Sequence, residues 1–248
     1  MIDTHCHLET LNNIDEVVQK MGNNKMITAG TDLESNKKVL ELIKKYPNVY
    51  GVIGYHPEFA DTTKEEDLEF LEKHINDEKI VGIGEIGLDY YYSKENKEKQ
   101  TELFKKQIEI AKKYNKTIVI HSREALEDTY NILKEENIKD LKVVMHCYSG
   151  SKEMALRFKE FNMKFGIGGV VTFKNAAKLK EVVKSLDLED LLLETDTPYL
   201  TPEPYRGKTN EPYNIIYVAK EIAKIKEIDE NLVLKITTDN AERQFDLK

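Results

Sequence analysis

Cysteine is scarce in this sequence. Only Cys6 and Cys147 occur in 248 residues, too few for a disulfide framework in a chain of this size. Each lies beside a histidine, yet small buried thiols are the expected role. If residues 3–7 are extended, Cys6 points to the face opposite His5 and His7, which separates it from any site that these two histidines form.

Long hydrophobic runs and an N-terminal leader are also missing. No apolar stretch approaches the ~20 residues that a membrane-spanning helix requires. Met1 is followed directly by residues 2–5, without the basic segment and apolar core of a signal peptide. We therefore expect a cytoplasmic protein with no membrane partner. No heptad pattern is present, so a monomer is the default expectation.

Positive charge is not in excess. The 37 Lys and Arg residues are outnumbered by 45 Asp and Glu residues, which gives a formal net charge of −8 at pH 7. This balance disfavours a protein that binds nucleic acid over a broad basic surface. It still permits a nuclease in which bound cations attract phosphate locally, because such ions are the largest charges in their site.

The sequence does contain a repeated alternation of short β-branched runs with amphipathic, Lys- and Glu-rich stretches such as 100–114. This alternation is typical of βαβ units and a parallel sheet. Eight strand-like runs favour a closed (β/α)8 barrel, the TIM barrel, whose usual size of ~250 residues suits a single domain over 1–248. The eight runs are 2–5, 25–29, 49–54, 80–85, 117–121, 142–146, 164–167 and 191–194.

An open, doubly wound sheet is the alternative arrangement of such units. It would usually carry a glycine-rich phosphate loop after its first strand, whereas residues 5–12 contain no glycine. A further helix near 240–246 is expected to pack as an extra element outside the eight units.

Polar residues gather where the predicted strands end. His5 and His7 close the first run, and their i, i+2 spacing places both imidazoles on one face of an extended segment. The C-terminal strand ends of a (β/α)8 barrel form the face on which active sites assemble. Of the six histidines in the chain, only His74 lies in a helical segment. Six candidates stand at strand ends: His5, His7, Glu85, His121, His146 and Asp196.

Together these side chains indicate a metal site. Each one alone would more often be a polar cap or a salt-bridge partner. A buried ring of imidazoles and carboxylates without an ion, however, would leave polar groups unsatisfied at ~1–3 kcal/mol each. Nitrogen and oxygen donors without thiolates favour a divalent cation such as Zn²⁺ or Mn²⁺ over Ca²⁺, and Mg²⁺ also stays open.

Six ligands exceed the need of one tetrahedral ion with an open position, so we expect two cations. Two ions ~3.5–4 Å apart can convert bound water into hydroxide and stabilise a leaving oxygen. Asp196 is the expected proton acceptor for the attacking water. The expected division is His5, His7 and Asp196 at one ion, His121 and His146 at the other, and Glu85 as the catalytic bridge.

Five segments carry these residues in order along essentially the whole chain: 2–8 (IDTHCHL), 84–90 (GEIGLDY), 121–123 (HSR), 146–150 (HCYSG) and 194–200 (ETDTPYL). Their combination resembles the TatD-type deoxyribonuclease family of metal-dependent TIM-barrel hydrolases. The resemblance implies the same six metal ligands. It also implies DNA as the substrate, in single-stranded form, because several members are described as divalent-metal-dependent 3′→5′ exonucleases that favour single strands.

The resemblance further implies substrate contacts. It points to His56 as a contact to a substrate phosphate, although Glu58 stands where one common form of the pattern has a second histidine. Asp89, Arg123 and Arg206 are additional candidates for substrate contacts, with a salt bridge as the alternative role of each.

Two alternatives to a deoxyribonuclease stay open. The same centre would suit hydrolysis of an amide, a lactone or the ester of a D-aminoacyl-tRNA. Many related amidohydrolases bridge their metals with a carboxylated lysine, so Glu85 favours the TatD branch without identifying the bond that is cut. A metal-binding barrel that has lost activity and serves as an interaction module is the second alternative, which the complete ligand set disfavours.

Overall fold

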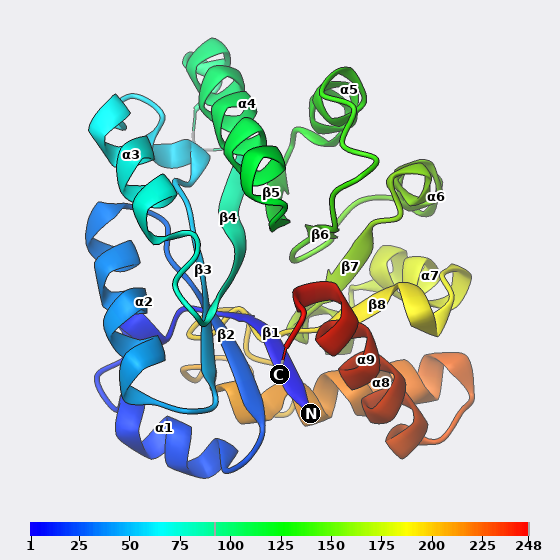
Figure 1. The fold of residues 1–248 in the computed structure, drawn as a ribbon. Helices are drawn as coiled ribbons and strands as arrows, with labels where there is room; N and C mark the ends of the chain where they lie inside the picture. The colour runs from blue at the N-terminus through cyan, green and yellow to red at the C-terminus, as the bar shows by residue number, and fades with distance from the viewer. Residues whose placement is uncertain (92, 248) are drawn as a thin grey trace.

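A computed structural model describes residues 1–91 and 93–247 and confirms the predicted TIM barrel. Eight parallel strands form one sheet in the order β1-β2-β3-β4-β5-β6-β7-β8, the order in which they occur along the chain. Parallel neighbours need a crossover connection, and a helix supplies each one. Figure 1 shows the strands around the centre and the helices as an outer ring.

The bounds of the elements follow the predicted alternation closely. The strands are β1 (Ile2–Cys6), β2 (Lys25–Ala29), β3 (Val49–Ile53), β4 (Ile80–Asp89), β5 (Thr117–Arg123), β6 (Val143–Met145), β7 (Lys164–Ile167) and β8 (Leu191–Leu193). The helices are α1 (Ile14–Met21), α2 (Leu33–Lys45), α3 (Glu65–His74), α4 (Lys97–Tyr114), α5 (Leu126–Glu135), α6 (Lys152–Phe158), α7 (Ala177–Ser185), α8 (Ile215–Lys226) and α9 (Glu230–Phe245).

Two strands are longer than predicted. The sequence suggested that Glu85 and His121 end their strands, but β4 continues to Asp89 and β5 to Arg123. The two strands stay paired to their last residues, Asp89 with Arg123, and their register shifts once, between Ile83 and Ile86. Four other strands differ from the prediction by a single residue at one or both ends, the usual uncertainty of such boundaries.

The barrel closes between β1 and the segment that follows β8. The Asp196 backbone N–H donates to the His5 carbonyl at 3.0 Å. The buried Asp3 carboxylate accepts from the Thr195 backbone N–H at 3.0 Å and from its hydroxyl at 2.6 Å. This closure sets the first-strand histidines beside the loop that carries Asp196.

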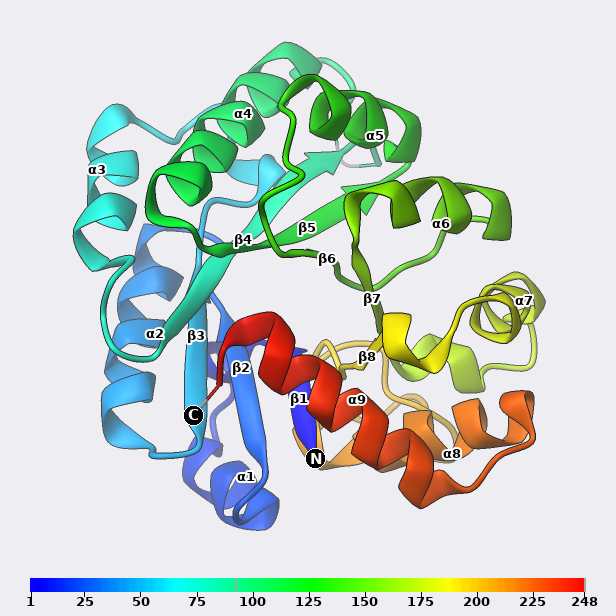
Figure 2. The ribbon, with the colours of Figure 1, turned by 45° about the vertical axis from the view of Figure 1, so that its right-hand side comes forward.

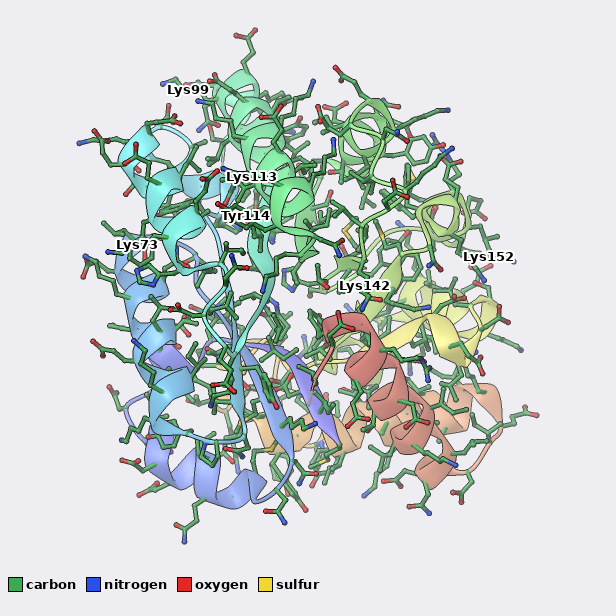
Figure 3. All side chains as sticks on the ribbon, in the orientation of Figure 1. Lys73, Lys99, Lys113, Tyr114, Lys142 and Lys152 are labelled. Carbon is green, nitrogen blue, oxygen red and sulfur yellow. The ribbon has the colours of Figure 1, made fainter. Side chains whose placement is uncertain are left out.

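The helices bury one face against the strands and expose the other. In α4, the predicted apolar face is buried, including Leu103, Phe104 and Ile108. Lysines occupy the outer faces, and Figure 3 shows Lys73 and Lys99 on the outside of the molecule. Within the described ranges, no helix is long and apolar enough to span a membrane.

The predicted extra helix is more than twice as long as expected, since α9 begins at Glu230 and not near 240. It crosses the end of the barrel where the strands begin (Figure 2). Its buried face includes polar residues that interrupt the apolar periodicity, which is why the sequence revealed only its last turns. Asn240, for example, donates to the carbonyl oxygens of Leu188 at 3.0 Å and Leu191 at 2.9 Å.

Candidate metal centre

The Glu85 carboxylate lies at the centre of the predicted ligand set. Its Oε1 atom is 2.6 Å from His146 Nε2 and 3.4 Å from His5 Nε2. The same oxygen is 3.8 Å from His121 Nδ1, and Oε2 is 3.7 Å from His7 Nε2. Four imidazoles from the ends of three strands, β1, β5 and β6, therefore face one carboxylate, as expected of a bridging ligand.

Asp196 completes the set on the side of β1. Its Oδ1 atom lies 3.5 Å from His7 Nε2 and 3.9 Å from His5 Nε2. The residue has φ +56°, in the left-handed region that Asp tolerates better than most residues with a Cβ. Three groups of donor atoms lie within 4.8 Å of one another among the described residues: His5–His7–Asp196, His5–Glu85–His146 and His56–Asp89–His121. The first is the set predicted for one ion.

The donor chemistry fits divalent cations. His5 is 1% exposed, and within the described part of the chain neither of its ring nitrogens has a hydrogen-bond partner. Such an orphaned buried group costs ~1–3 kcal/mol, and an ion would remove that cost. Burial alone would raise the pKa of Glu85, but the imidazoles of His146 and His5 hold it well below its usual range. An ionised carboxylate among imidazoles is a suitable binding set for a borderline cation.

The imidazoles are held in a strongly negative environment. Burial lowers the pKa of His146, but Glu85 and Glu194 outweigh it and raise that pKa well above the usual value. Burial also opposes the charged form of His7, yet Asp196 and Glu9 raise its pKa well above normal. The field that attracts protons to these rings would equally attract a divalent cation.

A cavity of about 600 Å³ opens over these ligands, within the usual size range of small-molecule sites. Arg123 lines it, and its guanidinium lies 3.7 Å from the centre of the Tyr91 ring. Arg206 is exposed and is placed 4.2 Å from the Phe173 ring, outside the described lining of the cavity. Cys147 also lines the cavity and is partly exposed, so the prediction of a buried thiol is wrong for this residue.

His56 lines the same cavity in a defined protonation state. Its Nδ1 accepts a hydrogen bond from the Glu58 backbone N–H at 3.2 Å, which places the proton of the neutral ring on Nε2. Burial, assisted by the charge of His121, lowers the pKa of His56 to about 3. His56 therefore presents an N–H donor and no free nitrogen for a metal, even though it lies close to Asp89 and His121.

Comparison with known proteins identifies the family. The model of the family described as TatD related DNase matches residues 2–246. The chain belongs to the TatD family. It is 43% identical to the uncharacterized metal-dependent hydrolase YabD of Bacillus subtilis, over 99% of this chain and 98% of that protein. It is 34% identical to the uncharacterized metal-dependent hydrolase YcfH of Escherichia coli K12, over 99% and 95%.

A solved structure of the family superimposes on the whole barrel. The crystal structure of YJJV, a TatD homologue from Escherichia coli K12, gives a TM-score of 0.93 at 28% identity and covers 100% of this chain and 98% of that one. The protein is thus a metal-dependent hydrolase of the TatD family, with the six predicted ligands gathered at one end of its barrel.

Three carboxylates lie behind the candidate ligand histidines of this TatD-family barrel. Each lies on the side of the ring nitrogen that points away from Glu85. Asp89 makes a hydrogen bond to His121, an arrangement that orients the imidazole and makes it a better ligand. His7 Nδ1 makes its hydrogen bond to the Ala29 carbonyl at 3.1 Å, with Glu9 beside it. The pairs are His7 Nδ1 with Glu9 Oε1 at 3.4 Å, His121 Nε2 with Asp89 Oδ2 at 2.9 Å, and His146 Nδ1 with Glu194 Oε1 at 3.7 Å.

Sequence reasoning did not single out two of these carboxylates. Glu194 lies two residues before Asp196, and Glu9 lies two residues after His7. The signal in the sequence was therefore an acidic residue two positions from a candidate ligand. The structure also reserves room for Glu194, because a Cβ atom at Gly166 would clash with its carboxylate. Asp89, predicted to contact the substrate, lines the cavity, is 1% exposed, and its carboxylate lies 2.9 Å from the candidate ligand His121.

Buried amide side chains hold the loops that carry the site. Each bonds backbone groups next to a functional residue and is not itself a candidate ligand. Gln107 bonds both backbone groups of Tyr55, and Gln100 bonds both of Asp89. Asn210 donates to the carbonyl oxygens of Thr195 at 2.9 Å and Tyr199 at 2.8 Å, one residue before Asp196 and three residues after it.

Proposed function

We propose that this TatD-family hydrolase cleaves phosphodiester bonds of DNA, removing nucleotides from the 3′ end. One observation carries the proposal: the cavity above the ligand set offers two hydrogen-bond donors suited to a phosphate, the His56 Nε2–H and the Arg123 guanidinium. A guanidinium matches phosphate geometry, and a neutral imidazole adds a donor without a permanent charge. The family description, TatD related DNase, supports the same chemistry.

The ligand set supports two divalent cations. Glu85 stands between the remaining ligands and is assigned to both ions. When bound, such ions lower the pKa of water to give hydroxide and neutralise charge on phosphoryl oxygens. Their assigned holders, beside Glu85, are His5, His7 and Asp196 for one and His121 and His146 for the other.

Asp196 is assigned to the proton of the attacking water. Its side chain is 14% exposed, against 5% for Glu85, so Asp196 is the carboxylate that water from the cavity reaches more readily. Burial alone would raise the pKa of Asp196, but His7 and His146 lower it below its usual value. The group is therefore ionised and ready to accept a hydrogen bond and then the proton.

The remaining residues orient the substrate. His56 donates from Nε2 to a phosphate oxygen, and Gln107 holds the preceding peptide so that this donor keeps its direction. Arg123 lines the cavity, packs on the Tyr91 ring through a cation–π contact, and binds a neighbouring phosphate by its positive charge.

The test is metal-dependent cleavage of single-stranded DNA labelled at the 3′ or the 5′ end. We expect stepwise shortening from the 3′ end with Mg²⁺, Mn²⁺ or Zn²⁺, and none with chelator. Glu85→Ala and Asp196→Ala should abolish it, whereas Glu135→Ala, which removes an exposed carboxylate paired with Lys105, should not. A folded, metal-binding protein that cleaves no DNA with any of these metals would refute the proposal and direct the search to other esters and to amides.

A further inference from the structure

We propose that Tyr91 and Tyr199 are base-stacking positions on opposite sides of the barrel opening, which bind unpaired nucleobases flanking the reacting phosphate. The inference rests on the proposed function and names the part of the DNA that the protein recognises. Tyr91 follows β4 by two residues, and Tyr199 follows β8 by six. These strands are four apart in a ring of eight, and Figure 1 shows them on opposite sides of the barrel.

The exposure of these two rings is unusual for the chain. Five large hydrophobic side chains are exposed within the described residues, and the two most exposed, at 57% each, are Tyr91 and Tyr199. Both belong to segments that follow the C-terminal ends of strands, next to the metal ligands. Aromatic rings that combine apolar faces with a polar tip are typical of surfaces that bind a partner.

Their backbones are fixed although their rings are exposed. The Tyr199 N–H donates to the Asp196 carbonyl at 2.8 Å, and its carbonyl accepts from Asn210 at 2.8 Å. The Tyr91 N–H donates to the Asp89 carboxylate at 2.9 Å. Each ring is thus attached one hydrogen bond away from a residue of the site, so its position relative to the reacting phosphate is preorganised.

The surroundings of each ring suit a nucleotide. The centre of the Tyr199 ring is 6.3 Å from that of the ligand His7, and Tyr199 lines the cavity. On the side of β4, Arg123 lines the cavity and its guanidinium lies 3.7 Å from the centre of the Tyr91 ring. This side therefore pairs an aromatic face for a base with a cation for its phosphate, the combination found in grooves for single-stranded nucleic acid.

Stacking also resolves the conflict between a DNA substrate and a net charge of −8. A chain without a broad basic surface gains little affinity from releasing counterions, so affinity has to come from the metals and from the bases. The faces of the bases are available only in an unpaired strand, because a duplex covers them with neighbouring base pairs. The recognised chemistry is accordingly an unstacked nucleobase and not the duplex backbone.

The test is a double-mutant cycle on equilibrium binding. The metal-loaded protein is titrated into a fluorescent oligothymidylate with phosphorothioate linkages and into the same strand with abasic sites at its 3′ end. We expect Tyr199→Ala to weaken binding of the intact strand roughly 5- to 150-fold, and Tyr91→Ala to act in the same direction. Neither should weaken binding of the abasic strand further. Tyr199→Phe, which keeps the ring, should bind like the parent.

Leu156→Ala is the matched control, because it removes another exposed apolar side chain, 47% exposed, from α6. Equal losses on intact and abasic strands would overturn the inference, and so would a Tyr199→Ala variant that binds both strands like the parent. Failure of the proposed function has a separate readout. The protein would then leave unmodified DNA uncut, whatever the binding measurements on intact and abasic strands show. If the protein cleaves DNA but the loss of binding in Tyr199→Ala and Tyr91→Ala does not depend on the bases, only the stacking positions are refuted.

Discussion

Removing the buried amide of Gln107 should cost more stability than its size suggests. The side chain is fully buried on α4 and makes two hydrogen bonds to Tyr55, at 2.8 Å to the N–H and 2.9 Å to the carbonyl. Gln107→Ala leaves both backbone groups buried without partners, at ~1–3 kcal/mol each. The free energy of unfolding should fall by about 2–6 kcal/mol, and at ~2–4 °C per kcal/mol for a chain of this length the Tm should fall by roughly 4–24 °C.

The assay is thermal and urea-induced unfolding of the metal-free protein, with Gln19→Ala as control. Gln19 is an exposed residue of α1, and its loss should change stability by less than about 0.5 kcal/mol. Gln107→Glu should lose at least as much stability at neutral pH, because it replaces the donor to the Tyr55 carbonyl by a buried carboxylate oxygen without a partner. If Gln107→Ala unfolds like Gln19→Ala, the backbone of Tyr55 finds other partners and the reasoning is wrong.

Three further outcomes follow from the metal centre. Saturation with metal at about 100 times its Kd should stabilise the fold by ~2.7 kcal/mol per ion. In differential scanning fluorimetry this corresponds to a rise in Tm of about 5–11 °C, which chelator reverses. Glu85→Gln should diminish this metal-induced rise in Tm. Glu194→Gln should weaken metal binding about 10- to 100-fold in calorimetry, because His146 loses the carboxylate behind it. Gly166→Ala should lower stability by ~1–3 kcal/mol in denaturant unfolding, because the added methyl group meets the Glu194 carboxylate.

The proximity of the candidate ligands was predictable because two simple rules apply to all of them. Strand periodicity located the runs, and the C-terminal ends of parallel strands in a barrel must meet at one face. His5, Glu85 and His146 thereby became neighbours although 141 positions separate the first from the last. Small errors in strand ends did not matter, since a residue one to three positions beyond its strand, such as His7, His146 or Asp196, still faces the same opening.

The supporting residues could not be predicted in the same way. Glu194 reaches His146 only because β7 places a glycine between its neighbours, and that depends on how three strands pack. Gln107 and Asn240 are polar residues on buried faces of helices, where sequence patterns lead one to expect apolar side chains. Their partners are backbone groups of other elements, so no spacing within the sequence reveals them. For the same reason, the polar face of α9 concealed most of that helix.

The residues that hold the loops of the site are different from the candidate metal ligands, and this difference bears on how the metal centre forms. In small zinc domains the metal supplies the folding energy, and the chain is unfolded without it. Here Asp3 joins β1 to the segment after β8, and Gln100, Gln107 and Asn210 fix the neighbouring loops, without being among the six predicted ligands. The imidazoles compensate the carboxylates of the centre in the absence of metal, as the raised pKa of His146 and the lowered pKa of Glu85 indicate. We therefore predict that the barrel folds without metal and presents a preorganised set of donors to divalent cations.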